Sequence, residues 1–68
     1  MIEICEYLDG KRIASFLCVT NSTIEAQERF RKNCSDADKC LSFFRPVDEK
    51  DPKNLPLIKL YMQEKAII

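Results

Sequence analysis

The chain carries four cysteines whose thiols could bind zinc, form disulfides or act as nucleophiles: Cys5, Cys18, Cys34 and Cys40. Their spacing lacks the two-residue separation of a zinc knuckle, and the chain has no histidine to complete a metal site. A four-cysteine zinc site and a Cys34–Cys40 disulfide are the alternatives that the spacing leaves open. We expect instead that the four side chains are small, partly buried and reduced, and that the protein uses no metal or cofactor.

The absence of histidine also limits catalysis. Ser–His and Cys–His pairs, the usual activated nucleophiles, cannot form in this chain. A site built on lysine or carboxylate groups is compatible with the composition, but 68 residues offer little concave surface to desolvate one. We therefore expect a protein that is not an enzyme.

The charged residues balance, because eleven basic and eleven acidic side chains give a net charge of zero. This balance argues against a general binder of nucleic acid or anionic membranes. A nucleic-acid-binding accessory protein that uses a local basic patch is the alternative. Two of the basic residues on a predicted helix are also spaced to pair with Glu25 and Glu28, which favours a solvated face. The candidate patch consists of Lys11, Arg12, Arg29, Arg31 and Lys32.

A cluster of acidic residues lies in Val47–Pro56, a charged segment that proline interrupts twice and that we predict to be a loop. The acidic residues lack the spacing and the central glycine of a calcium-binding loop. Their functional interpretation is a recognition loop for a basic partner surface, and the simpler one is a solvated loop. The residues concerned are Asp48, Glu49 and Asp51.

The clearest structural signal is the dipeptide Asp9-Gly10, which separates two apolar-rich runs, Met1–Leu8 and Lys11–Thr20. An Asp-Gly pair supplies the positive φ that the tight mirror-image turn of a hairpin needs. A continuous count from this turn pairs Ile4 with Ser15. Both faces of the resulting hairpin carry apolar side chains, whereas a half-solvated sheet should show one polar face.

A helix is predicted from Thr23 to about Cys34. Its start fits a capping box, with Ser22 at the N-cap and Glu25 reaching back to it, and Ser35–Asp36 supply a turn after its end. The helix is one-sided, so it should pack that side on a sheet. The apolar residues at helical spacing are Ala26, Phe30 and Cys34.

A third strand is predicted over Lys39–Val47, with Pro46 placing its end at an edge or in a turn. The segment Ile58–Gln63 alternates apolar and polar residues with the period of a strand, although its residues are good helix formers. The alternation favours a strand, and a helix is the alternative. We therefore predict one domain, residues 1–68, of the α+β class: a small antiparallel sheet with one helix packed on one face, β-β-α-β-β, or β-β-α-β-α in the alternative.

One helix covers only one face of a sheet, so apolar side chains on the other face need a partner. Tyr7, Phe16 and Cys18, with either Phe43 or Phe44, are predicted to form a contiguous patch, and such patches mark interaction surfaces. We expect a module that binds another protein, or itself as a structural homodimer, through this face, an edge strand or the Val47–Pro56 loop. The candidate partner-binding residues are Tyr7, Phe16, Phe44, Asp48, Glu49 and Asp51.

In size and plan the chain resembles the small inhibitors that phages and mobile elements encode against host machinery, including anti-CRISPR proteins. The resemblance lies in the short chain, the helix-on-sheet order and the lack of catalytic groups. No motif takes part in it, so no site residue is carried over. It implies an inhibitor that acts by binding a protein.

The N-terminal residues lack the basic and apolar regions of a secretory signal. No apolar run approaches the roughly 20 residues of a membrane span. We therefore expect a cytoplasmic protein that does not act at a membrane.

Overall fold

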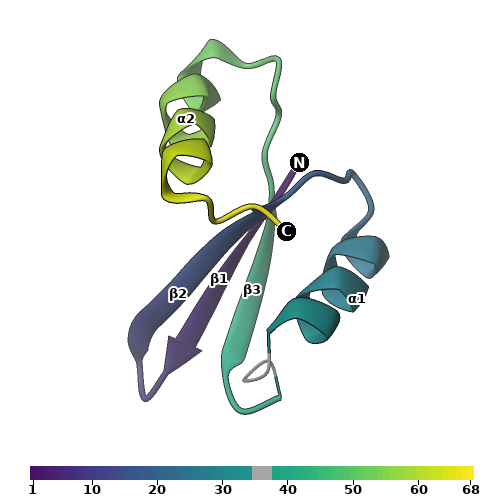
Figure 1. Cartoon of the computed structure of the whole chain (residues 1–68), viewed down its shortest axis with the longest axis vertical. Helices are drawn as coiled ribbons and strands as arrows, with labels where there is room; N and C mark the ends of the chain where they lie inside the picture. The colour runs from purple at the N-terminus through teal and green to yellow at the C-terminus, as the bar shows by residue number, and fades with distance from the viewer. Residues whose placement is uncertain (35–37) are drawn as a thin grey trace.

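The computed structural model describes residues 1–34 and 38–68, which form a three-stranded antiparallel sheet and two helices (Figure 1). β1 lies between β2 and β3. The predicted α+β class, with a small antiparallel sheet and a helix packed on one face, is confirmed, whereas the turn predicted at Ser35–Asp36 lies outside the described residues. The elements are β1 (Ile2–Leu8), β2 (Lys11–Cys18), α1 (Thr23–Asn33), β3 (Leu41–Pro46), the 3-10 turn η1 (Pro52–Asn54) and α2 (Leu55–Glu64).

The hairpin turn forms as predicted. Asp9 has φ of 52° and Gly10 has φ of 77°, so both central residues occupy the left-handed region that a type I′ turn requires. Glycine adopts this conformation without strain, and aspartate tolerates it better than most residues. The turn sets Leu8 directly opposite Lys11.

A β-bulge at Ile13 shifts the register of this hairpin. Tyr7 lies opposite Arg12, but the preceding residue of β1, Glu6, lies opposite Ala14. One residue of β2 is therefore unpaired, and the register predicted by a continuous count is wrong beyond that point. The count fails because the length of the turn does not reveal an extra residue farther along the strand.

The shift decides which side chains share a face of the sheet. Ile4 lies opposite Phe16 rather than opposite Ser15, so Phe16 joins the face of Ile4. Leu17 moves to the other face, where it lies opposite Glu3. Each face thereby receives an apolar cluster of its own, one for each helix.

α1 begins where the sequence indicates. Ser22 is the N-cap, and its hydroxyl oxygen accepts a hydrogen bond from the backbone N–H of Glu25 at 3.3 Å. The reciprocal half of the predicted capping box is wrong. The Glu25 carboxylate accepts instead from the Thr20 hydroxyl at 2.9 Å and from Arg29 at 2.6 Å.

α1 packs its predicted apolar stripe on the Ile4 face of the sheet. Ala26 and Phe30 are 0% and 2% exposed. The Phe30 ring lies between those of Phe16 and Phe44, with centroid separations of 6.1 and 6.0 Å. This is the larger of the two core clusters, and its remaining buried members are Ile2, Ile4 and Cys18.

α2 occupies the segment for which alternation favoured a strand, so the chain follows the alternative order β-β-α-β-α. Pro56 lies in its first turn, where a missing N–H costs no hydrogen bond. The residues of this segment are good helix formers, and contacts with Leu17 and Val47 select the helix over the strand that the alternation favoured. The residues of α2 that face the second core cluster are Leu57, Ile58 and Tyr61, which pack near Leu17 and Val47.

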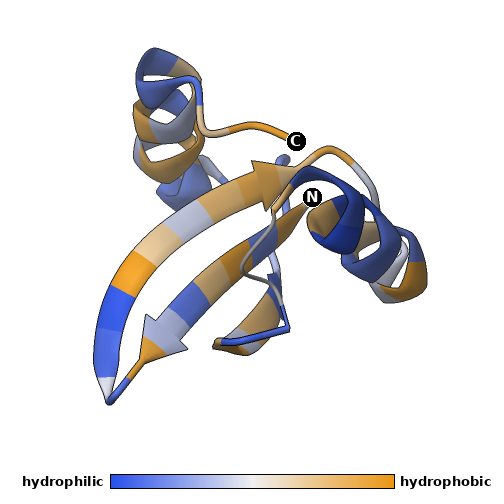
Figure 2. Ribbon diagram, turned by 60° about the horizontal axis from the view of Figure 1, so that its bottom comes forward, coloured by the Kyte–Doolittle hydropathy of each residue, from blue (hydrophilic) through white to orange (hydrophobic). Residues whose placement is uncertain are grey.

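The chain ends on the outer side of β2. After α2, Lys65 adopts a left-handed conformation with φ of 57°, and the chain turns back to the sheet (Figure 1). The backbone N–H of Leu17 donates to the Ala66 carbonyl at 2.8 Å, and the N–H of Ile68 donates to the Leu17 carbonyl at 3.0 Å. Figure 2 shows hydrophobic colouring where β2 meets this segment and hydrophilic colouring at the start of β2, beside the hairpin turn. Among the described helices, none has the length and apolar character to cross a membrane.

Candidate binding surface

A buried carboxylate organises the sheet face that α2 covers. Glu3 is 6% exposed, and it accepts hydrogen bonds from the Tyr61 hydroxyl at 2.8 Å and from Arg45 Nε at 3.0 Å. Arg12 donates to the Ser15 hydroxyl at 2.9 Å and lies 3.5 Å from the Tyr61 hydroxyl oxygen. Both carboxylate oxygens of Glu3 therefore have donors, as a buried charge requires. This network fastens α2 to the sheet.

Burial favours the protonated form of two titratable groups near this network, the Cys5 thiol and the Tyr61 phenol. Burial raises the pKa of the Cys5 thiol, and the charge of Glu3 raises it further, against the opposing effect of Arg12 and Arg45. Burial also raises the pKa of the Tyr61 phenol. Because the thiolate is the reactive form of cysteine, Cys5 is a poor nucleophile at neutral pH.

We expect the protein to lose stability in alkaline solution. The folded state holds the Tyr61 proton more tightly than the unfolded state does, because the pKa of Tyr61 is raised above its ordinary value of about 10. Its contribution is complete below that pH and declines as the pH rises toward the folded value, and Cys5 acts in the same direction. Urea unfolding between pH 8 and 11 tests this. A decline as steep in Tyr61→Phe as in the wild type would contradict the assignment to Tyr61.

The outer side of β3 is open. β3 is an edge strand, and no other described strand pairs with its outer side, whereas the C-terminal segment occupies the outer side of β2 at Leu17. Two apolar side chains of β3 are exposed, Leu41 at 63% and Phe43 at 54%. Tyr7 packs edge-on against Phe43, with ring centroids 5.5 Å apart. We call the outer side of Leu41–Pro46, with these two exposed side chains, the β3 edge.

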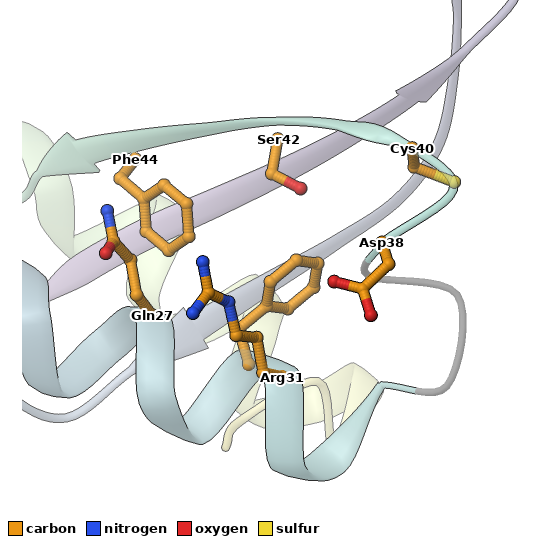
Figure 3. Close-up of a pocket in the computed structure, with 7 residues that line it drawn as sticks. Gln27, Arg31, Asp38, Cys40, Ser42 and Phe44 are labelled. Atoms are coloured by element: carbon orange, nitrogen blue, oxygen red, sulfur yellow. The ribbon is translucent and has the colours of Figure 1, made fainter.

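On the face of the sheet opposite to Leu41 and Phe43, a pocket of about 200 Å³ opens between β3 and α1 (Figure 3). The rings of Phe30 and Phe44 are among the groups that line it, and the Arg31 guanidinium and the Asp38 carboxylate lie on its two sides (Figure 3). This α1–β3 pocket thus offers aromatic surface together with both signs of charge. Its other lining residues are Gln27, Cys40 and Ser42.

The predicted aromatic patch does not exist as one surface. Tyr7 and Phe43 lie on the α2 face of the sheet, while Phe16 and Phe44 lie on the α1 face against Phe30. The prediction was wrong because the bulge in β2 moves Phe16 to the face that α1 covers. Of the aromatic residues proposed for partner binding, only Tyr7 contacts an exposed side chain of the β3 edge, the Phe43 ring.

The acidic residues of the predicted recognition loop have local roles. An Asp48 carboxylate oxygen accepts from the backbone N–H of Lys50 at 2.9 Å, and Asp51 caps η1 by accepting from the N–H of Lys53 at 3.0 Å. Glu49 is exposed. Two of the three carboxylates therefore shape the loop that leads into α2.

The basic residues proposed as a nucleic-acid patch do not form one surface. Arg29 is engaged by Glu25 and by the Val19 carbonyl, at 2.6 and 3.3 Å. Arg12 contacts Tyr61 on the α2 face, and α1 packs on the opposite face of the sheet. The set that the fold divides is Lys11 and Arg12 at the hairpin, and Arg29, Arg31 and Lys32 on α1.

The cysteines are also divided by the sheet. Cys5 lies on the α2 face, and Cys18 is buried on the α1 face. The four thiols therefore do not converge on one point, and the alternative of a four-cysteine zinc site has no geometric basis in this fold.

Sequence reasoning missed the two buried carboxylates of β1, Glu3 and Glu6, which are 6% and 4% exposed. The available signal was their position within an apolar strand. A glutamate is seldom fully buried unless it is paired, so this position alone did not indicate burial. Their burial follows from β1 becoming the central strand, which only the assembled sheet determines.

Comparison with known proteins gives no functional information, so a functional proposal for this chain rests on the geometry described above. The chain matches no protein-family model, no curated protein and no solved structure.

Proposed function

We propose that this chain is a non-enzymatic module that binds another protein by accepting an extended segment of it as a fourth strand along the β3 edge. The observation that supports this proposal is the contrast between the two edges of the sheet. The outer side of β2 is occupied at Leu17, whereas the β3 edge is open and flanked by exposed Leu41 and Phe43. An open edge strand is a template for strand addition.

The two faces of β3 would contact different side chains of the added segment. Side chains alternate across a strand, so every second residue of the partner lies beside Leu41 and Phe43, and the others lie toward the α1–β3 pocket. Full burial of an apolar side chain contributes about 1.5–3 kcal/mol. The favoured partner segment therefore alternates apolar residues with polar or charged ones that suit Arg31 and Asp38.

A second copy of the chain is the competing occupant. Antiparallel pairing of two β3 strands about Phe43 would set Arg45 of one copy opposite Leu41 of the other. Arg45 already forms an ion pair with Glu3 at 2.8 Å. The pairing would therefore place this charged side chain against the apolar Leu41 of the other copy. A different protein avoids the mismatch. An inhibitor of the kind that the chain resembles in plan needs no more than such a surface to act.

Selection from a random peptide library on the wild-type chain tests the proposal. The selected peptides should be extended and alternating, and they should slow the hydrogen exchange of amides in Leu41–Pro46. Phe43→Lys places a charge beside the edge and should weaken their binding about ten- to a hundredfold, the equivalent of one lost apolar contact. The matched control is Ile24→Lys, which adds the same charge at a side chain that is 71% exposed on α1.

Two results would overturn the proposal. One is a set of peptides that bind Phe43→Lys as tightly as the wild type, or that protect amides elsewhere. The other is a stable dimer, seen by light scattering in reductant, whose protected amides are those of β3. That dimer would assign the β3 edge to a second copy.

A further inference from the structure

Glu6 is the second buried carboxylate of β1, and it lies on the opposite face from Glu3. It is 4% exposed and lies between Ala14 of β2 and Ser42 of β3. Within the described residues, its Oε1 atom has no hydrogen-bond partner. The two ion pairs in the described part of the chain use other carboxylates. A buried carboxylate without a counter-charge is costly unless a ligand compensates it.

Glu6 lines a cavity of about 370 Å³ between the end of α1 and β2. Most of its lining residues are apolar by type, and Asn33 supplies the other strongly polar side chain. The Asn33 amide nitrogen donates to the Arg29 carbonyl at 2.7 Å, so its amide oxygen remains as a second acceptor. The remaining lining residues are Ile13, Ala14, Phe16, Cys34 and Ile68.

We propose that this cavity binds a monovalent organic cation with a short apolar stem, an alkylammonium or alkylguanidinium group. The cation would neutralise Glu6, and the stem would lie against Ile13 and Phe16. The aromatic ring adds a favourable surface for a cation. The same group occurs in small amines and in the lysine or arginine side chain of a protein.

This site is separate from the β3 edge. It lies on the β2 side of α1, whereas the α1–β3 pocket lies on the β3 side. A test of cation binding is therefore independent of a test of strand addition.

The test is a titration of the isotope-labelled full chain, followed by NMR. n-Butylammonium and n-propylguanidinium should each cause saturable shifts at Glu6, Phe16 and Asn33, and n-butanol, which is neutral and of the same length, should not. Glu6→Gln should weaken cation binding by about tenfold or more. The control Glu64→Gln removes the same charge at an exposed position on α2 and should leave the affinity unchanged.

A further arm separates the two sources of the cation. Binding of N-acetyl-arginine amide as tight as that of n-propylguanidinium supports a side chain of a partner protein, and exclusion of this bulkier probe supports a small amine. The proposal is overturned if neither cation gives saturable shifts, if n-butanol matches them, or if Glu6→Gln binds as the wild type does. The n-butanol comparison uses the wild type alone, so it decides the matter even if Glu6→Gln fails to fold.

Discussion

Phe30→Ala is expected to lower the free energy of unfolding by about 3–5 kcal/mol. Phe30 is 2% exposed, and its ring fills the space between Phe16 and Phe44 at the centre of the α1 cluster. Truncation removes buried apolar surface and leaves a cavity that α1 cannot close without moving off the sheet. A single helix covers this face in the described chain, so no other element is placed to replace the lost contacts.

The size of this loss sets the conditions of the measurement. A domain of this length has a total stability of roughly 3–10 kcal/mol, so the variant approaches the unfolding threshold. Urea unfolding should be measured in reductant with a stabilising osmolyte present. The control is Ile24→Ala on the exposed face of α1, which should change the stability by less than about 0.5 kcal/mol. A loss below about 1 kcal/mol for Phe30→Ala would mean that α1 does not depend on this side chain.

The parts of the fold that could be predicted are those that short stretches of sequence determine. The Asp9-Gly10 turn depends on two residues with positive φ, and the start of α1 depends on Ser22 and the N–H of Glu25 three residues later. The apolar stripe of α1 required only helical periodicity. Each of these signals lies within a single element or turn, so no knowledge of the assembled sheet was needed.

The parts that could not be predicted depend on contacts between distant residues. The bulge at Ile13 is fixed by what both faces of β2 must pack against, and α2 is selected by its contacts with Leu17 and Val47. The aromatic patch failed for the same reason, because a shift of one residue moved Phe16 across the sheet. The burial of Glu3 and Glu6 followed only once β1 became the central strand.

Tyr61→Phe is expected to cost about 1–3 kcal/mol, the second large effect that the structure predicts. The substitution keeps the ring that packs in the α2 cluster and removes only the hydroxyl that donates to Glu3 at 2.8 Å. The Glu3 oxygen is then left buried without its donor. Because Arg45 is 61% exposed, its ion pair with Glu3 is screened by solvent and cannot compensate for the loss.

The matched control is Tyr7→Phe, which removes a hydroxyl that makes no hydrogen bond within the described residues. Its cost should stay below about 0.5 kcal/mol. A double-mutant cycle with Glu3→Leu, which removes the acceptor, isolates the contact, and the two changes should be non-additive because they remove the same hydrogen bond. Hydrogen exchange of α2 amides should rise in Tyr61→Phe, since the network holds this helix on the sheet. Equal costs for the two tyrosine variants would show that packing alone holds α2 in place.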